Sequence, residues 1–589
     1  MDDRGGAAPI TGGTRGRQML PGRVLTDRRA LYRGLLLLAV VAMVVALYLG
    51  GLGAYPLANA TESLYAEIAR EMLRTGHFIV PRLDGAVYLQ KPPLLYWLAD
   101  VSFAAFGVGT AAARLVCALA GLATIVVTGA MARRFSGRRG ALYAALTLAT
   151  SGGFLFTAHV FFFATLLTLW TAIALLAGYR WYETGARRAL RLAALALALG
   201  VLTKGLVALA IVGLPGIGLL ARGGRRGRWR ELPDPWAIGL FLGVTAPWFV
   251  LGAIHLPGFL HDVLWNEQFG RFFGTRVPDD YYHGPLYFYL PILAADLLPW
   301  VMIVPALVLG RSSAPTPAQR RLGRFAWIWI LSNLVFFSLS ADKGNYYLVP
   351  VLPAAALLLG MRLERLERSR PRRSPVYLLV PLTVPLVFLA LRAFIGDHGL
   401  QLGWIRGGGP WRAVWTVMGL LGSGAAVLGL RGRIRAGAVA LAAMMAPLLG
   451  LLILAYRADP APFSAAPLAP LVRRMEAGGV ARVVAAGRYD PVSALPFYLR
   501  RQVPVVGYDG AEFAYARAHP GQGAGTFAHA GGLVPQLKRG RAVIVARGSD
   551  PEALGMLRQR VPALQRLGSV GPYVVYGSRA GSRGGHRHS

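Results

Sequence analysis

Residues 113–157 read ARLVCALAGLATIVVTGAMARRFSGRRGALYAALTLATSGGFLFT, two long apolar runs on either side of an arginine cluster. An apolar run of about 20 residues is long enough to cross a bilayer core of roughly 30 Å. Positive residues in short loops between spans are retained on the cytoplasmic side. The stretch therefore predicts a helical hairpin whose arginine turn faces the cytoplasm.

The same alternation of apolar runs and arginine clusters continues along the chain, and arginines recur in every second connection. We expect thirteen transmembrane spans, near 34–53, 113–132, 139–157, 161–179, 189–202, 205–221, 236–255, 286–310, 323–340, 346–361, 376–394, 412–430 and 436–456. This places the N-terminus in the cytoplasm and, with an odd number of spans, the C-terminus outside. The predicted class is an α-helical polytopic membrane protein.

Composition supports this class. The 589 residues are 55% hydrophobic, with a mean hydropathy of +0.47, too apolar for a soluble protein of this size. A net charge of +36 would suit a nucleic-acid-binding protein, but the arginines lie in short loops between spans, so we expect no nucleic-acid partner. The single cysteine, Cys117, lies inside a predicted span and cannot form an intrachain disulfide.

The pattern also divides the chain into parts. We expect a cytoplasmic disordered tail over 1–33, a transmembrane domain over 34–460 with outer loops 54–112 and 256–285, a small extracytoplasmic α/β domain over 461–578, and a disordered tail over 579–589. In the α/β domain the segments ARVVAAG, QVPVVGY, RAVIVAR and YVVYGS predict short strands. In the first outer loop, 61–76 predicts a short helix that Thr61 caps and Gly76 ends.

Lysines are rare in this chain, yet three lie in short connections on the predicted outer side. Lys91, Lys204 and Lys343 each neighbour Pro or Gly, in QKPP, TKGL and DKGN. Together with Arg271 they would suit a phosphate group. The alternative is that each lysine only snorkels to the membrane interface.

Five segments resemble the GT-C glycosyltransferases related to aminoarabinose transferase and the protein O-mannosyltransferases. They are YAEIAREMLRTGHFIVPRLDGAVYLQKPPLLYWL at 65–98, LTKGLVAL at 202–209, WNEQFGRFF at 265–273, GPLYFYLPIL at 284–293 and DKGNYYLVPVLPA at 342–354. The resemblance runs from about 34 to 365. It implies a GT-C fold and an enzyme of the inner (cytoplasmic) membrane, and a direct displacement at the anomeric carbon would make the transfer inverting. Such an enzyme moves a sugar from a polyprenyl-phosphate donor to a glycolipid, glycan or protein acceptor on the outer face.

The resemblance also implies roles for single residues. Tyr88, Lys91 and Arg271 match residues that hold the lipid phosphate. Lys204 and Lys343 match the family's TKG and KG turns, and Tyr346 and Tyr347 lie in the matching aromatic stretch. An aromatic belt at the lipid interface would also explain the tyrosines.

The catalytic acids of the family are less well matched. Members carry Asp-Glu ahead of the first-loop helix, where this chain has Thr61-Glu62. We therefore predict Glu62 as the catalytic base, with Asp84 and Asp342 as weaker candidates. The alternatives are a carboxylate at a helix N-terminus for Glu62 and turn residues for the two aspartates.

Two further positions concern a metal. Aminoarabinose transferases have Glu before the loop-one lysine and His three before the later arginine, where this chain has Gln90 and Gln268. We therefore predict no metal ligands and no assigned cofactor, and leave a divalent cation open.

Other functions stay open as well. A polytopic protein with charged outer loops is also typical of a lipid-linked-sugar transporter or flippase, and the missing acids fit a catalytically silent homologue that binds lipid-linked sugar. The chain shows no internal repeat, and its polar residues gather at one predicted surface, which favours an enzyme over a transporter.

Overall fold

The computed structural model divides the chain into two compact units, up to Ala46 and from Leu47 onward. The residues that it describes are 22–222, 226–280, 282–309, 312–369, 377–382, 385–386, 409–508, 510–519, 521–523, 525–548 and 551–578. Helix α1 (Gly22–Leu49) begins inside the segment 1–33 that the sequence predicted as a tail. Residues 1–21, the tail after 578 and most of the predicted span 376–394 lie outside the described residues.

Helices fill the predicted transmembrane domain. Between residues 110 and 458, apart from the helices of the second outer loop, the described ones are α4 (Thr110–Ala149), α5 (Gly152–Ala158), α6 (Phe163–Thr184), α7 (Arg187–Lys204), α8 (Val207–Arg222), α9 (Pro235–His255), α11 (Tyr289–Asp296), α12 (Val304–Leu309), α13 (Pro317–Leu339), α14 (Leu352–Arg368), α17 (Gly409–Leu430), α18 (Ile434–Ala443) and α19 (Met445–Ala458). Short 3₁₀ turns join or flank some of them: η1 (Arg226–Glu231), η3 (Trp300–Ile303), η4 (Val349–Val351) and η6 (Val380–Leu382). Among the described residues, six helical stretches are long and apolar enough to cross a membrane by length and composition. The chain is thus a helical membrane protein, as predicted.

Two glycines mark where helices turn. Gly137, at φ +62°, interrupts α4 between the predicted spans 113–132 and 139–157. Gly205, at φ +83°, separates α7 from α8 immediately after Lys204, at the predicted turn. Such positive φ values favour glycine. A Cβ on Gly205 would also approach the Gln268 side chain to 2.6 Å, so a larger residue at 205 would displace that side chain.

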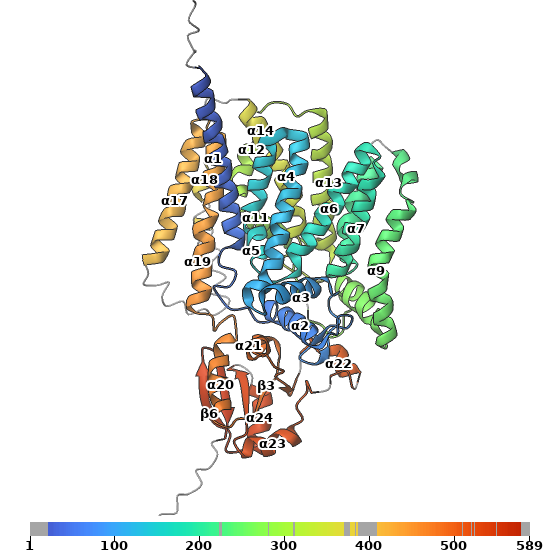
Figure 1. The fold of residues 1–589 in the computed structure, drawn as a ribbon, viewed down its shortest axis with the longest axis vertical. Coiled ribbons are helices and arrows are strands. Elements are labelled where there is room, and N and C mark those ends of the chain that lie inside the picture. Colours follow the sequence, from blue (N-terminus) through green and yellow to red (C-terminus); the bar gives the residue numbers. More distant parts are fainter. Residues whose placement is uncertain are drawn as a thin grey trace, which may run out of the picture. The chain divides into compact units, whose positions relative to one another are not determined.

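The first outer loop holds α2 (Glu62–Thr75), the two-residue strands β1 (Arg82–Leu83) and β2 (Ala86–Val87), and α3 (Leu94–Phe106). Figure 1 shows α2 and α3 between the ends of the long helices and the C-terminal sheet domain. Gly76 ends α2 at φ +73°, as predicted. Thr61 occupies the N-cap position, as predicted, but its side chain makes no capping hydrogen bond.

The second outer loop continues from α9 into the π-helix η2 (His261–Gly270) and the short helix α10 (Arg271–Phe273). This helical run places Glu267 and Arg271 one turn apart. They pair at 3.1 Å, as their i, i+4 spacing allows.

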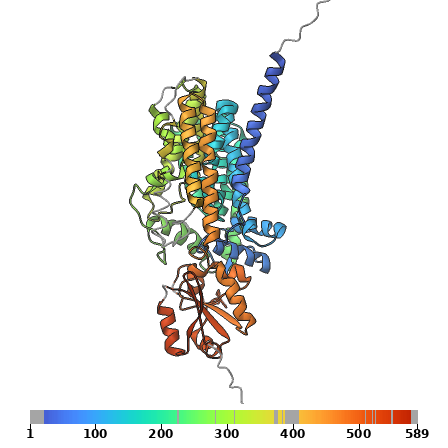
Figure 2. The ribbon, with the colours of Figure 1, turned by 90° about the vertical axis from the view of Figure 1, so that its left-hand side faces the viewer.

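The C-terminal domain is a five-stranded mixed sheet with helices, seen edge-on in Figure 2. Its elements are η7 (Ala466–Leu468), α20 (Ala469–Ala477), β3 (Arg482–Ala486), η8 (Asp490–Val492), α21 (Ala494–Leu499), β4 (Val505–Val506), α22 (Ala514–Ala518), α23 (Ala530–Lys538), β5 (Ala542–Arg547), α24 (Pro551–Arg560), β6 (Gln565–Val570) and β7 (Tyr573–Gly577). The strand order is β4-β3-β5-β7-β6, with β3 parallel to β4 and β5 and the remaining pairs antiparallel. The four predicted strands are confirmed. Strand β6 was missed because it is a mostly exposed edge strand with a register shift near Gly568 and lacks a clear apolar alternation.

The two faces of this sheet pack differently. Val484 and Ile544 join the cluster that α23 and α24 cover. Their neighbours Val483 and Val543 belong to a cluster that includes residues of α2 and α3. Because successive strand residues point to opposite faces, one face packs with α23 and α24, while the other belongs to a cluster that also holds residues of α20, α21 and the first outer loop.

Candidate functional site

Several long helices have one end at an arginine cluster and the other end at the predicted outer loops. At the arginine ends, Arg321 of α13 pairs with Glu183 of α6 at 3.2 Å, and Arg191 of α7 pairs with Asp234 before α9 at 3.2 Å. The opposite end of α7 carries Lys204. The loops predicted to share one side of the membrane therefore do gather at one end of the helices.

At that end the loops enclose a cavity of about 500 Å³, called here the amphipathic cavity. It is lined by Tyr65, Gln90, Lys91, Lys204, Leu206, Val207, Leu209, Ala210, Glu267, Gln268, Phe269, Arg271, Phe272, Phe273, Phe336, Phe337, Ser340, Asp342, Tyr346 and Tyr347. Charged groups and tyrosines share its lining with aliphatic side chains and five phenylalanines. Five of the predicted phosphate residues line it: Lys91, Lys204, Arg271, Tyr346 and Tyr347.

Lys91 and Arg271 are held in this cavity by acidic neighbours. The Lys91 Nζ lies 3.9 Å from Glu267 and donates to the carbonyl of Gln90 at 2.9 Å. Arg271 contacts Glu267 at 3.1 Å, Asp342 at 3.4 Å and Asp280 at 3.5 Å. Both side chains keep some exposure, 13% for Lys91 and 19% for Arg271. Each cation is therefore positioned by its partners yet open to a ligand.

Lys204 is positioned differently, by aromatic rings. Its Nζ lies 4.3 Å from the ring centre of Tyr347 and 4.8 Å from that of Tyr346. A cation over a ring face at such distances is stabilised by the ring quadrupole. The Tyr347 hydroxyl in turn donates to Asp342. The aromatic stretch thus orients one cation and one carboxylate of the cavity.

Burial and neighbouring charges determine the protonation states of Lys91 and Glu267, which face each other across the cavity wall. Burial, and then the neighbouring Arg271 cation, lower the pKa of Lys91 to about 8. Burial alone would raise the pKa of Glu267, but Arg271, Lys91 and Arg276 together hold it below its ordinary value. Glu267 is therefore an ionised carboxylate that contacts three cations. Its lowered pKa makes it a poor acceptor of a proton, so it does not suit the role of catalytic base.

Two predicted phosphate residues do not line the cavity. The Tyr88 hydroxyl donates to the Gln90 side chain at 3.1 Å. Lys343 donates to the carbonyls of Ser338 at 2.5 Å and Phe337 at 3.3 Å, at the end of α13. A lysine there satisfies carbonyls that a helix C-terminus leaves unpaired. Tyr88 and Lys343 thus support neighbouring parts of the site.

The predicted base, Glu62, is engaged elsewhere. Its carboxylate pairs with Arg114 at 2.7 Å and accepts hydrogen bonds from the backbone N–H groups of Ala58 and Phe161. The Arg114 side chain has no exposed surface and that of Glu62 only 2%. Glu62 does not line the amphipathic cavity, so its surroundings favour the alternative of a structural carboxylate, and its catalytic role stays a prediction.

Asp84, the other predicted acid, is fully buried. Both carboxylate oxygens accept from the N–H of Val503 at 3.0 Å, and its carbonyl accepts from Thr526. Burial raises the pKa of Asp84 well above its ordinary value. The residue fastens the first outer loop to the C-terminal domain, and its catalytic role also stays a prediction.

The residues that the structure describes include no group of three or more His, Cys, Asp or Glu side chains placed to hold a metal ion. Gln90 and Gln268 both line the amphipathic cavity. An amide side chain is a weaker ligand for zinc than a thiolate, imidazole or carboxylate. A divalent cation stays an open prediction.

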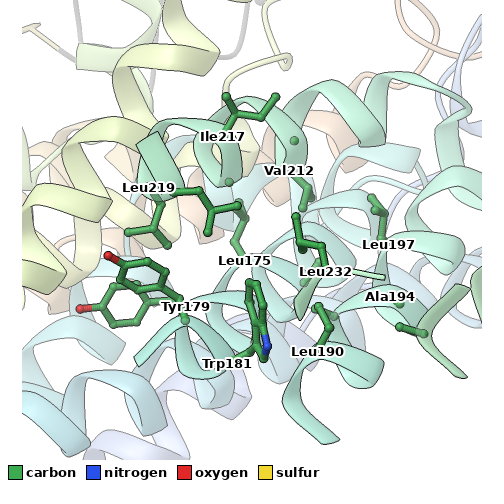
Figure 3. A pocket seen from close by; sticks show the side chains of 18 of the residues that line it. Leu175, Tyr179, Trp181, Leu190, Ala194, Leu197, Val212, Ile217, Leu219 and Leu232 are labelled. Atoms are coloured by element: carbon green, nitrogen blue, oxygen red, sulfur yellow. The ribbon is translucent and has the colours of Figure 1, made fainter. Parts of the chain in front are cut away.

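A second cavity, of about 440 Å³, lies among α6, α7, α8 and α9 and is almost wholly apolar (Figure 3). Trp181, Leu197 and Val212 are among its lining side chains, and none of the described lining residues is charged. This apolar cavity offers no partner for a phosphate. It therefore does not compete with the amphipathic cavity as the predicted site.

Some groups of the site escaped the sequence-based selection. Glu267, Arg276 and Asp280 complete the ion cluster: Arg276 pairs with Glu267 at 2.7 Å and also with Asp280. The high density of charged residues in the second outer loop could have identified these three residues from the sequence. Arg114 was harder to identify. It stands out in the sequence only as a lone arginine in an apolar run, and its partner Glu62 lies 52 residues away.

Comparison with known proteins agrees with the geometry. The family of Dolichyl-phosphate-mannose-protein mannosyltransferases matches residues 90–250. An undecaprenyl phosphate-α-4-amino-4-deoxy-L-arabinose arabinosyl transferase of Pseudomonas savastanoi pv. phaseolicola is 31% identical over 62% of this chain and 67% of its own length. A relative of the same description from Pseudomonas fluorescens is 32% identical over 60% of this chain and 65% of its own, so that match leaves about a third of the relative uncovered.

A solved structure extends the likeness to nearly the whole chain. The crystal structure of ArnT from Cupriavidus metallidurans bound to undecaprenyl phosphate matches with a TM-score of 0.77 and 25% identity, covering 92% of this chain and 98% of that one. On these similarities the chain belongs to the family of GT-C glycosyltransferases related to the aminoarabinose transferases and the protein O-mannosyltransferases.

Proposed function

We propose that this protein is an inverting membrane glycosyltransferase. It moves a sugar from a polyprenyl-phosphate donor to an acceptor on the outer face of the cytoplasmic membrane. The acceptor is a glycolipid, a glycan or a protein. The names of the relatives support a pentose on undecaprenyl phosphate as the donor.

The amphipathic cavity is the observation that carries this proposal. Lys91, Lys204 and Arg271 supply three cations against the two carboxylates of Glu267 and Asp342, at a cavity whose other lining is largely apolar, with five phenylalanines. A prenyl phosphate has the same two parts, an anionic head and an apolar chain. Arginine binds phosphate through paired hydrogen bonds and lysine as a point charge, and the phenylalanines suit the isoprenoid chain.

Electrostatics then favour the reaction. During transfer the acceptor oxygen bonds to the anomeric carbon, and the bond from that carbon to the phosphate oxygen breaks with its electron pair left on the phosphate. Charge grows on the phosphate as it leaves. Cations already held in place stabilise that charge without reorganising, and they act more strongly in a partly buried site than in water.

The acceptor hydroxyl must lose its proton to a base. Glu62 remains the base predicted from the resemblance, although its pairing with Arg114 argues for a structural role. Assay of Glu62→Gln for transfer, in protein shown to be folded, decides between the two. Full activity would end the catalytic assignment.

The orientation follows from the separation of charges. We place the arginine ends of α7 and α13 in the cytoplasm and the amphipathic cavity, with the C-terminal domain, on the outer side. Cysteine-accessibility labelling in intact cells tests this, since the native Cys117 is buried. An outward-facing arginine loop would reject the arrangement.

The experiment for the function uses full-length protein in vesicles with undecaprenyl phosphate-aminoarabinose carrying a labelled sugar. Transfer of label to an added glycolipid supports the proposal. Movement of intact donor across the membrane without transfer would indicate a flippase. Binding with neither outcome would indicate a catalytically silent homologue.

A further inference from the structure

A third hollow, of about 720 Å³, lies between the second outer loop and the C-terminal domain and is called here the polar cleft. One wall is formed by residues of the second outer loop near His261 and Trp265, and the other by residues within the segment 510–519 of the C-terminal domain. The Tyr515 hydroxyl donates to the carbonyl of Pro257 at 2.7 Å and so ties the two walls together.

The polar cleft adjoins the amphipathic cavity. Gln90 and Glu267 line both hollows. Two side chains therefore form a shared boundary between them, and a molecule in the polar cleft would lie next to a donor whose phosphate rests on Lys91 and Arg271. A transferase needs such a second site, because the acceptor must reach the anomeric carbon while the donor stays bound.

The lining of the polar cleft indicates what it binds. Its described charged groups are three carboxylates, Asp262, Glu267 and Glu512, and two guanidinium groups, Arg276 and Arg517. Arg276 is already paired with Glu267 and Asp280. This balance gives a free phosphate no surplus of positive charge to bind.

Flat rings and hydrogen-bonding groups complete the lining. Trp265 is 60% exposed. Tyr515 stacks on His519 with ring centres 4.1 Å apart. Tyr515 is itself buried, so Trp265 is the ring that offers an exposed apolar face. Such a face, next to carboxylates and imidazoles that accept or donate hydrogen bonds, suits a molecule with alternating C–H faces and hydroxyl groups.

We propose that the polar cleft binds the saccharide part of the acceptor, which the C-terminal domain helps to hold beside the donor. This inference rests on the proposed function, because it assigns the second substrate of the same reaction. It gives the C-terminal domain a direct part in acceptor recognition. It also favours a glycan or glycolipid over a protein as the acceptor.

The first test introduces a large side chain into the wall of the polar cleft that the C-terminal domain forms. Ala518 is exposed, lines the polar cleft and does not line the amphipathic cavity. With undecaprenyl phosphate-aminoarabinose as donor and a solubilised glucosamine-disaccharide glycolipid as acceptor probe, Ala518→Trp is expected to raise the acceptor KM about tenfold or more and leave the donor KM unchanged. An unchanged acceptor KM, or an equal rise in both, would overturn the proposal.

Trp265→Ala provides the same test from the opposite wall, with the same expected split between the two KM values. Met556→Trp is the matched control. Met556 is 59% exposed on α24 and does not line the cleft, so an added ring there should change neither KM.

The second test does not depend on transfer. Ala518→Cys adds one accessible thiol to a chain whose only native cysteine is buried. The glycolipid probe should slow maleimide labelling of this variant at least several-fold, but not of Met556→Cys. Protection by inorganic phosphate or an unglycosylated peptide instead of the glycolipid, or no protection at all, would reject saccharide binding. Protection without transfer by the wild type would retain the cleft and reject the proposed function.

Discussion

Glu62 and Lys91 belong to the same outer loop, and both were selected from the sequence, yet the structure places them in opposite settings. Glu62 lies in a buried ion pair with Arg114 and holds loop backbone in place. Lys91 lies at the wall of a cavity with an incomplete set of partners. A fully paired charge stabilises the fold, and a partly paired one at a cavity remains available to a ligand.

The largest expected effect is the loss of folding free energy when the buried pair of Glu62 and Arg114 is broken. Arg114→Ala leaves the buried carboxylate of Glu62 without its partner and frees the carbonyls of Leu52, Tyr55 and Pro56. Breaking a buried pair in this way costs about 3–5 kcal/mol of folding free energy. Thermal unfolding of the purified protein measures it, with the exposed Arg324→Ala as control. Equal unfolding temperatures for the two variants would show that the pair is not structural.

Arg271→Ala tests the ligand side. Hydrogen bonds to charged groups contribute about 1.5–3 kcal/mol, so the Kd for undecaprenyl phosphate should rise roughly tenfold to a hundredfold. Fluorescence or calorimetric titration of the purified protein measures the Kd. Arg271→Lys should retain part of the affinity, because it keeps the charge and loses the paired geometry. An unchanged Kd in Arg271→Ala would remove this residue from the site.

The pKa of Lys91, lowered to about 8, predicts a pH dependence. The lysine is charged below that pH and neutral above it, so its contribution to donor affinity should be full below about pH 8 and be lost as pH rises through it. The decline has a limit of about tenfold per pH unit for one proton. Lys91→Arg should abolish this step, since arginine stays charged. The same decline in Lys91→Arg would assign the pH dependence to another group.

The smallest expected effects, on donor Kd and on folding free energy, distinguish Lys204 from Lys343, two lysines that looked equivalent in the sequence. Lys204 lines the amphipathic cavity and Lys343 binds helix carbonyls instead. Lys204→Ala should weaken donor binding several-fold. Lys343→Ala should leave the Kd unchanged and lower the folding free energy by about 1 kcal/mol. Titration and unfolding of both variants, side by side, measure the difference, and the reverse assignment of effects would contradict the structure.

The sequence predicted what depends on local pattern. Apolar period, glycine turns and the positions of rare lysines identified the helices, the break at Lys204 and the loops that converge. It could not predict which way a side chain points. The pairing of Glu62 with Arg114, the attachment of Asp84 to Val503 and the turning of Lys343 toward α13 all join residues through packing that no local pattern records.

Photocrosslinking most directly tests whether the amphipathic cavity holds a polyprenyl phosphate. Full-length protein would be irradiated with a photoreactive undecaprenyl phosphate, and the modified residues located by mass spectrometry. Adducts on 267–273 and 336–347, suppressed in Arg271→Ala, are the predicted result. Adducts confined to the apolar cavity around Trp181 and Leu197, or unaffected by the Arg271→Ala substitution, would contradict it.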